Sequence, residues 1–200
     1  PAALSALSET GLTSVDRAII DKAKVILLGA IETETRTPMA HKESVDLMRI
    51  GSAAVDAAPD GISLVGAKIE TARAFGFLSA KAMLDPDSGA FEEGLKQQLE
   101  TQATIPALFW ISTDGNDRTH QIDAGRRYMR ANLLATSLGI AMHPMSQSLQ
   151  EYREMEMAYK DIHALLQGDK GGRIQMLARI GYSDTNVPPT PRWPMEKHLI

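Results

Sequence analysis

The sequence predicts an α+β protein in which a small central sheet is flanked by helices. Residues 1–105 carry apolar side chains mostly at helical spacing, which predicts a mainly helical part. Residues 106–182 alternate between short apolar runs and amphipathic segments, which predicts the order β-α-β-α-β. Residues 183–200 are rich in proline and predict an extended tail. We expect a single domain over residues 1–200, because a chain of 200 residues can bury a sizeable core.

The first part is expected to hold helices separated by turns. Segments with apolar residues at three- and four-residue steps run from Thr13 or Ser14 to about Thr33, from Ser44 to about Val55, from Ala67 to Leu84 and from Gly89 to about Gln102. Between the second and third of these, Pro59-Asp60-Gly61 is a turn signal. Residues 57–66 are therefore expected to form a long loop.

The clearest strand is Pro106–Thr113, because it is continuously apolar and rich in aromatic residues. Continuous apolarity predicts that this strand is covered on both faces. A long helix is expected from Asp117 to Leu138, ended by Gly139, and a short strand over Ile140–Met142 follows it. The apolar stripe of the long helix is expected at Ile122, Met129, Leu133 and Leu138, with close approach of a neighbour at Gly125, Ala131 and Ala135.

The last helix and strand are expected between residues 148 and 180. Ser148 and Glu151 have the spacing of a capping box, which predicts a helix that begins there. Its apolar face, Tyr152, Met155, Tyr159, Ile162 and Leu166, is interpreted as core or dimer interface, and Gly168, Gly171 and Gly172 are expected to end it. The final strand is expected over Arg173–Ile180.

Composition excludes several classes of function. The net charge of −4 has both signs interspersed, which argues against a nucleic-acid partner, and no apolar run is long enough for a membrane span. The absence of cysteine excludes disulfides and thiolate chemistry and leaves the compartment open. No nucleophile elbow is present, and the widely spaced histidines predict no metal site: His41, His120, His143, His163 and His198.

Two features of the last third are candidates for binding. The strand that breaks at Pro144 leads into a polar turn, and such a turn can present backbone and side chains to a ligand. The tail Val187–Pro194 is stiffened by prolines and carries Arg192 and Trp193. We expect Trp193 to anchor this tail in an apolar groove.

Residues 117–193 resemble the C-terminal half of nitroreductase-family proteins, and look most like the twin-domain nitroreductase-like proteins of bacteria. The matching pieces are Asn132–Ile140, His143–Gln147 and Ala178–Tyr182 with Pro188–Pro194. Weaker similarity reaches back to Ser44–Arg49 and Asp60–Leu64. The resemblance implies a nitroreductase-like fold.

The resemblance also implies an FMN-dependent oxidoreductase that transfers hydride from NAD(P)H through the flavin to a small, electron-poor acceptor. It implies that the turn packs along the flavin ring through His143, Pro144, Met145, Ser146 and Gln147. Arg192 occupies the position that pairs with the flavin phosphate. No side chain is expected to be catalytic, since the flavin supplies the chemistry. The expected assembly is a homodimer, or a pairing with an N-terminal half.

Two alternatives remain open. Acidic Glu32 and Glu34 stand where the family has a phosphate-binding arginine motif, and Ser146-Gln147 replaces a glycine-bearing turn. These departures favour a non-catalytic module for dimerisation or flavin sequestration. The chain also opens at Pro1 without an initiator methionine, which predicts a processed or shortened product. It would then be the C-terminal half of a longer twin-domain chain.

Overall fold

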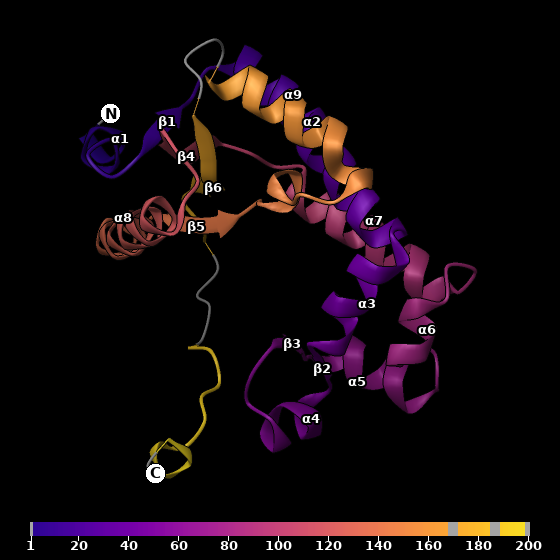
Figure 1. Ribbon diagram of the computed structural model, residues 1–200. Coiled ribbons are helices and arrows are strands. Elements are labelled where there is room, and N and C mark those ends of the chain that lie inside the picture. Colours follow the sequence, from indigo (N-terminus) through magenta and orange to yellow (C-terminus); the bar gives the residue numbers. More distant parts are fainter. Residues whose placement is uncertain (1, 168–171, 185–188, 199–200) are drawn as a thin grey trace. The chain divides into compact units, whose positions relative to one another are not determined.

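The computed structural model describes residues 2–167, 172–184 and 189–198 (Figure 1). The chain divides into two compact units, and each is described by itself. Unit 1 comprises Pro1–Glu34 and Leu99–Thr185, and unit 2 comprises Thr35–Gln98 and Asn186–Ile200. The predicted α+β class, with a small sheet flanked by helices, is confirmed.

Unit 1 is built around a four-stranded antiparallel sheet (Figure 1). Its strands, in spatial order, are β1 (Leu12–Ser14), β4 (Ala107–Thr113), β6 (Arg173–Gly181) and β5 (Ala141–Pro144). The three strands expected from the sequence are all present. The edge strand β1 was not expected, because a segment of three residues is too short to display a period.

The core of unit 1 covers both faces of β4. All residues from Ala107 to Ile111 are buried, which confirms the prediction from the apolar run. Because side chains alternate along a strand, Phe109 and Ile111 share one face, where they cluster with alanines of α8 (Arg118–Ser137). Full burial of a side chain such as Phe109 contributes about 1.5–3 kcal/mol.

Helices lie on both sides of this sheet. Figure 1 shows α8 and α1 (Ala2–Leu7) on one side, and α2 (Arg17–Arg36) with α9 (Glu156–Gln167) on the other. Helix α8 begins where Asp117 accepts hydrogen bonds from the amides of Thr119 and His120, at 2.8 and 3.1 Å.

The face that α8 buries is the one with small side chains, which was predicted in part. The buried residues are Ala124, Ala131 and Ala135, which let the helix approach the sheet closely. The expected apolar stripe is exposed instead: Ile122, Met129, Leu133 and Leu138. The predicted close approach of a neighbour is confirmed at Ala131 and Ala135, whereas Gly125 is exposed.

The predicted capping box was also wrong. Residues from Gln147 to Leu149 form a short 3-10 turn, those from Arg153 to Met155 form another, and α9 begins only at Glu156. Ser148 is fully buried, so its hydroxyl does not cap a helix start. Met155 and Ile162 of the predicted apolar face are buried, as expected.

Unit 2 consists of short elements. They are α3 (Pro38–Asp46), β2 (Met48–Ile50), α4 (Ser52–Ala57), β3 (Ile62–Leu64), α5 (Ala67–Ala74), α6 (Ala80–Leu84), most of α7 (Gly89–Gln102) and a 3-10 turn at Met195–Lys197. β2 and β3 pair in parallel, and Met48 lies opposite Ile62.

The helix boundaries in unit 2 differ from those predicted. The helix expected over residues 44–55 is wrong, because Gly51 takes a positive φ of 90° and donates its amide to the carbonyl of Leu64. The helix expected over 67–84 is two helices, separated where Gly76 takes a φ of 76°. The expected loop over 57–66 contains β3.

Unit 2 has a small core and leaves several large apolar side chains exposed. Its buried apolar residues are Val45, Val55, Phe91 and Leu95. Edge-to-face packing of His41 on Phe91, with ring centroids 5.2 Å apart, joins α3 to α7. The large apolar side chains left exposed in this unit are Met39, Leu47, Ile62, Val65, Phe75, Phe77 and Met195.

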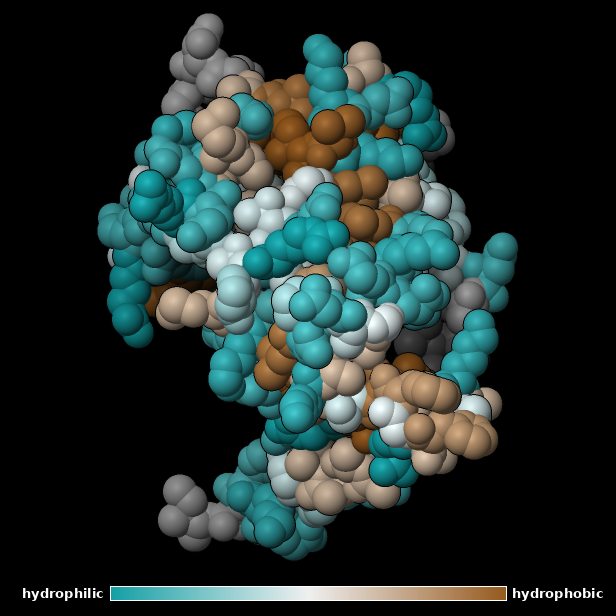
Figure 2. All heavy atoms as spheres, turned by 90° about the vertical axis from the view of Figure 1, so that its right-hand side faces the viewer, coloured by the Kyte–Doolittle hydropathy of each residue, from teal (hydrophilic) through white to brown (hydrophobic). Residues whose placement is uncertain are grey.

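On the face seen in Figure 2, hydrophilic side chains cover most of the surface and apolar ones form separate patches. Among the described residues, no helix is both long and apolar enough to cross a membrane. Gly168 and Gly171 at the predicted helix end, and Val187 and Pro188 in the tail, lie outside the part of the chain that the structure describes.

Candidate functional site

The residues predicted to bind the cofactor fall into both units. His143, Pro144, Met145, Ser146 and Gln147 belong to unit 1, whereas Arg192 belongs to unit 2. The turn and the tail are therefore described separately.

The turn in unit 1 leaves the sheet at the end of its edge strand. His143 lies opposite Arg179 of β6, and Pro144 lies opposite Ala178. The amide of Met145 donates to the carbonyl of Leu177 over 2.9 Å, so the chain stays fixed to β6 one residue beyond the strand. Residues from Gln147 to Leu149 then form the short 3-10 turn, which fixes the end of the segment His143–Gln147.

A positive charge lies next to this turn. The Arg179 guanidinium donates to the carbonyls of Thr101 and Thr104, at 2.6 and 2.9 Å, which fixes it beside β5. Partial burial, and then the charge of Arg179, hold the pKa of His143 below its usual range. His143 is therefore neutral at neutral pH and can both donate and accept a hydrogen bond.

The turn residues differ in what they offer a ligand. His143 and Pro144 are exposed, and Ser146 and Gln147 are half-buried. Met145 is fully buried, so its side chain packs in the core and only its backbone stands near the turn surface. Within the described residues, the buried hydroxyl of Ser148 has no hydrogen-bond partner. Polar groups left in this state cost about 1–3 kcal/mol, and they call for a structural or functional explanation.

The tail in unit 2 is bound to the turn that contains Asp60. Trp193 donates its indole N–H to Asp60 Oδ2 over 3.2 Å, and Arg49 donates to Asp60 Oδ1 over 2.6 Å. Trp193 is half-buried, so it anchors the tail by this hydrogen bond as well as by contact. Arg192 is exposed and lines an open hollow of about 590 Å³ together with Pro59, Pro191, Trp193, Met195 and His198.

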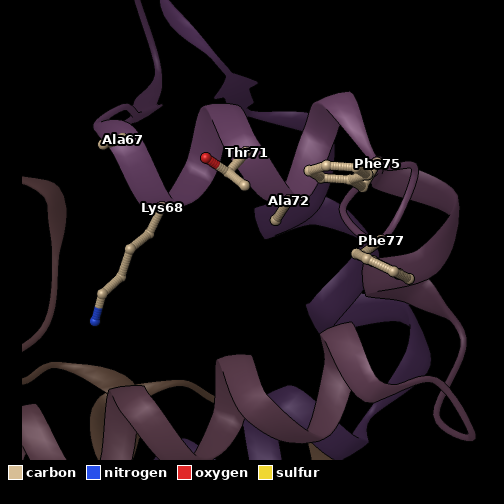
Figure 3. Close-up of a pocket in the computed structure, with 6 residues that line it drawn as sticks. All are labelled: Ala67, Lys68, Thr71, Ala72, Phe75 and Phe77. Carbon is tan, nitrogen blue, oxygen red and sulfur yellow. The ribbon is translucent and has the colours of Figure 1, made fainter.

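A second hollow, of about 450 Å³, lies along α5 and the segment that follows it. It is lined by Ala67, Lys68, Thr71, Ala72, Phe75 and Phe77 (Figure 3). The rings of Phe75 and Phe77 stack with centroids 6.3 Å apart, and Figure 3 shows the Lys68 side chain at the opposite end of the row. This hollow is open and apolar, with one cationic end.

Sequence reasoning missed Arg179, Ser148 and Asp60 as parts of these surroundings. Arg179 faces His143 only through the register of β5 on β6, and Asp60 meets Trp193 across 133 residues of chain. The turn signal at Pro59-Asp60-Gly61 was visible in the sequence. Its contact with the tail was not.

Comparison with known proteins places the chain by its sequence. No protein-family model matches it. Two proteins from two strains of Mycobacterium tuberculosis, both named as candidate NAD(P)H nitroreductases, are each 29% identical to it over 101 residues. The match covers 45% of this chain and 28% of each relative, so the chain spans only a part of the length of these relatives.

Solved structures were compared as well. An FMN-dependent nitroreductase of Mycobacterium smegmatis, in complex with NADPH, is 19% identical with a TM-score of 0.47, over 94% of this chain and 76% of that one. A nitroreductase-like family protein of Bacillus cereus is 15% identical with a TM-score of 0.39, over 60% of this chain and 64% of that one. The similarity to the nitroreductase family that the sequence indicates is confirmed by the two mycobacterial relatives.

Proposed function

We propose that this chain is part of an FMN-dependent oxidoreductase of the nitroreductase type, which passes hydride from NAD(P)H to a small, electron-poor acceptor. The sequence similarity to the two mycobacterial relatives carries the proposal. When bound, the flavin supplies the redox chemistry, and the protein supplies position, charge and a restricted pocket.

In this proposal, the turn His143–Gln147 lies along the flavin ring. The neutral imidazole of His143 offers one hydrogen-bond donor and one acceptor. The guanidinium of Arg179 beside it adds a positive charge, which would stabilise additional electron density on the flavin ring. The unpartnered hydroxyl of Ser148 among the described residues is consistent with a turn whose polar groups have a further partner. The residues present therefore fit a flavin.

Arg192 is proposed to bind the flavin phosphate. Its guanidinium is exposed at an open hollow and has a geometry that can hold phosphate through two parallel hydrogen bonds. Stiffening by Pro191 and Pro194 on either side lowers the entropy lost when the tail is ordered on a ligand.

We further propose that the 200 residues act as one nitroreductase-like domain and pair as a homodimer. The side chains of Ile122, Met129 and Leu133 on α8 are 50, 60 and 63% exposed. They recur at helical spacing along one face, and exposed apolar side chains that share a face can mark an interaction site. The small core of unit 2 and its exposed apolar side chains add to this argument.

The test is direct. The purified protein is incubated with FMN, free flavin is removed by desalting, and oxidation of NADH and NADPH is then followed with a nitroaromatic acceptor. Retained flavin with nicotinamide turnover supports the proposal. Retained flavin without turnover supports the non-catalytic, flavin-holding module instead. A colourless, inactive protein contradicts both.

A further inference from the structure

The Asp60 carboxylate in unit 2 accepts a hydrogen bond at each of its two oxygens, and one of the donors belongs to the tail. Oδ1 of Asp60 accepts a hydrogen bond from Arg49 of β2 over 2.6 Å, and Oδ2 accepts from the Trp193 indole over 3.2 Å. Both oxygens are therefore in use, and the carboxylate links β2 to the tail. A carboxylate is the side chain suited to this link, because it accepts hydrogen bonds at each oxygen and donates none.

The Asp60 carboxylate has a fixed place. Its own backbone amide donates to the carbonyl of Ala58 over 2.8 Å, and Gly61 completes the turn with a positive φ of 68°. Its partner Arg49 is held as well, since the other arm of the guanidinium lies 3.3 Å from the carbonyl of Asp46 and 3.4 Å from that of Met48. The ion pair is partly shielded, because 24% of the Arg49 side chain and 44% of the Asp60 side chain are exposed.

Anchoring Trp193 also restrains the residues next to it in the tail. Trp193 directly follows Arg192, so anchoring the indole restrains the backbone from which the Arg192 side chain extends. Pro191 and Pro194 restrict the backbone on either side of this pair. The amide of Lys197 then donates to the carbonyl of Pro194 over 3.0 Å and closes the short turn beyond. Arg192, Trp193 and Pro59, the residue before Asp60, line the same hollow.

We propose that Asp60 is a positioning residue, which latches Trp193 and thereby fixes Arg192 where it meets the phosphate of the cofactor. This inference rests on the proposed role of Arg192 as the phosphate ligand. It assigns a role to a side chain that touches no cofactor itself.

The decisive measurement compares the affinities of FMN and riboflavin, which differ only by the phosphate. We expect Asp60→Asn to reduce the preference for FMN by about tenfold, the equivalent of one charge-assisted hydrogen bond, and to leave the affinity for riboflavin unchanged. Arg192→Gln should remove the preference. Asp56→Asn, the same charge change in the neighbouring α4, is the matched control and should behave as the wild type.

A second readout follows the latch without any flavin. The chain has two tryptophans, so protein labelled with 5-fluorotryptophan gives two ¹⁹F signals, and Trp193→Phe assigns them. Asp60→Asn should shift the Trp193 signal toward that of a solvent-exposed indole, and Asp56→Asn should not.

The outcomes separate the two claims. If the wild type prefers FMN and Asp60→Asn keeps that preference, or loses affinity for both flavins alike, the role given to Asp60 is wrong and the proposed function stands. If the wild type binds neither flavin, the proposed function fails and the positioning of phosphate fails with it. An unshifted Trp193 signal in Asp60→Asn contradicts the latch itself.

Discussion

Gly61 determines the geometry of the turn that carries Asp60. Its φ of 68° lies in the left-handed region, and a Cβ built there would meet the carbonyl oxygen of Leu47. That oxygen is already used, since it accepts the amide of Ile62 over 2.9 Å at the start of β3. The turn, the parallel pairing of β2 with β3 and the latch on Trp193 thus depend on a residue without a side chain.

Gly61→Ala is expected to destabilise unit 2 by about 1–3 kcal/mol, because alanine is strained at this φ and its Cβ displaces the carbonyl of Leu47. Urea unfolding measures the loss, and hydrogen exchange at β2 and β3 locates it. Gly29→Ala in α2 is the matched control, since nothing lies within 4 Å of its added Cβ, and a gain of about 0.5–1 kcal/mol is expected. Equal effects of the two changes would refute this account of Gly61.

His163 joins α9 to β6 and can do so only as a neutral ring. Its Nδ1 lies 2.8 Å from the carbonyl of Tyr159, and its Nε2 accepts the amide of Ile174 over 3.1 Å. The ring also packs on Tyr159, with centroids 4.1 Å apart, and Arg173 lies over that tyrosine while pairing with Glu151. Burial is the main cause that lowers the pKa of His163.

The pH dependence of stability follows from that direction. A folded-state pKa below the usual 6.5 means that the unfolded chain binds the proton first. The contribution of His163 is therefore complete above about pH 6.5 and is lost as the pH falls from there through the folded-state pKa.

We expect His163→Gln to lower the free energy of unfolding by about 1–3 kcal/mol at pH 8 and to flatten its decline below pH 6.5. Urea unfolding at a series of pH values measures both effects. Part of the decline should persist, because the pKa of His143 is lowered as well. His198→Gln in the tail is the control. A decline as steep in His163→Gln as in the wild type would show that His163 does not titrate as described.

At the scale of elements, α8 carries two different faces. Its buried alanines fit the sheet, and its exposed residues Ile122, Met129 and Leu133 form the stripe that we propose as the dimer contact. Burial of this stripe in a partner would explain why large apolar side chains stand outside while small ones stand inside.

Leu133→Asp is expected to convert the dimer to a monomer, because a carboxylate in the centre of an apolar contact loses its hydration without gaining a partner. Light scattering during gel filtration gives the mass of each form. Val25→Asp on α2 places the same charge at another exposed aliphatic position, with Val25 74% exposed, and should remain dimeric. A wild type that is monomeric, or a Leu133→Asp protein that is still a dimer, would contradict the proposed contact.

The elements show what a single sequence can and cannot predict. β4 was predicted because a continuous apolar run is typical of a strand that is covered on both faces, and β6 was predicted because its sequence alternates in part. β2 and β3 have three residues each, and their pairing depends on the positive φ of Gly51 and Gly61. The spacing of apolar residues in the sequence does not reveal these backbone conformations. Ser148 and Glu151 had capping-box spacing, yet burial of Ser148 in the core overrode it.

The predicted site shows the same limit. His143–Gln147 was found because a proline breaks an apolar strand before polar residues. Arg179 and Asp60 were not found, because register and a contact across 133 residues place them. Tertiary structure brings these two residues to the sites, and local sequence patterns do not show which distant residues will meet.

At the scale of the whole molecule, two features are proposed to bind the cofactor, a strand-end turn in unit 1 and a latched tail in unit 2. The turn contributes a neutral imidazole beside a fixed guanidinium, and the tail contributes an exposed guanidinium between prolines. The central proposal is that the chain binds FMN.

The most direct test of that claim is a titration of the purified protein with FMN, followed by absorbance and by quenching of flavin fluorescence. We predict saturable binding, with FMN held more tightly than riboflavin and with that preference lost in Arg192→Gln. A wild type that leaves flavin absorbance and fluorescence unchanged throughout the titration would contradict the account.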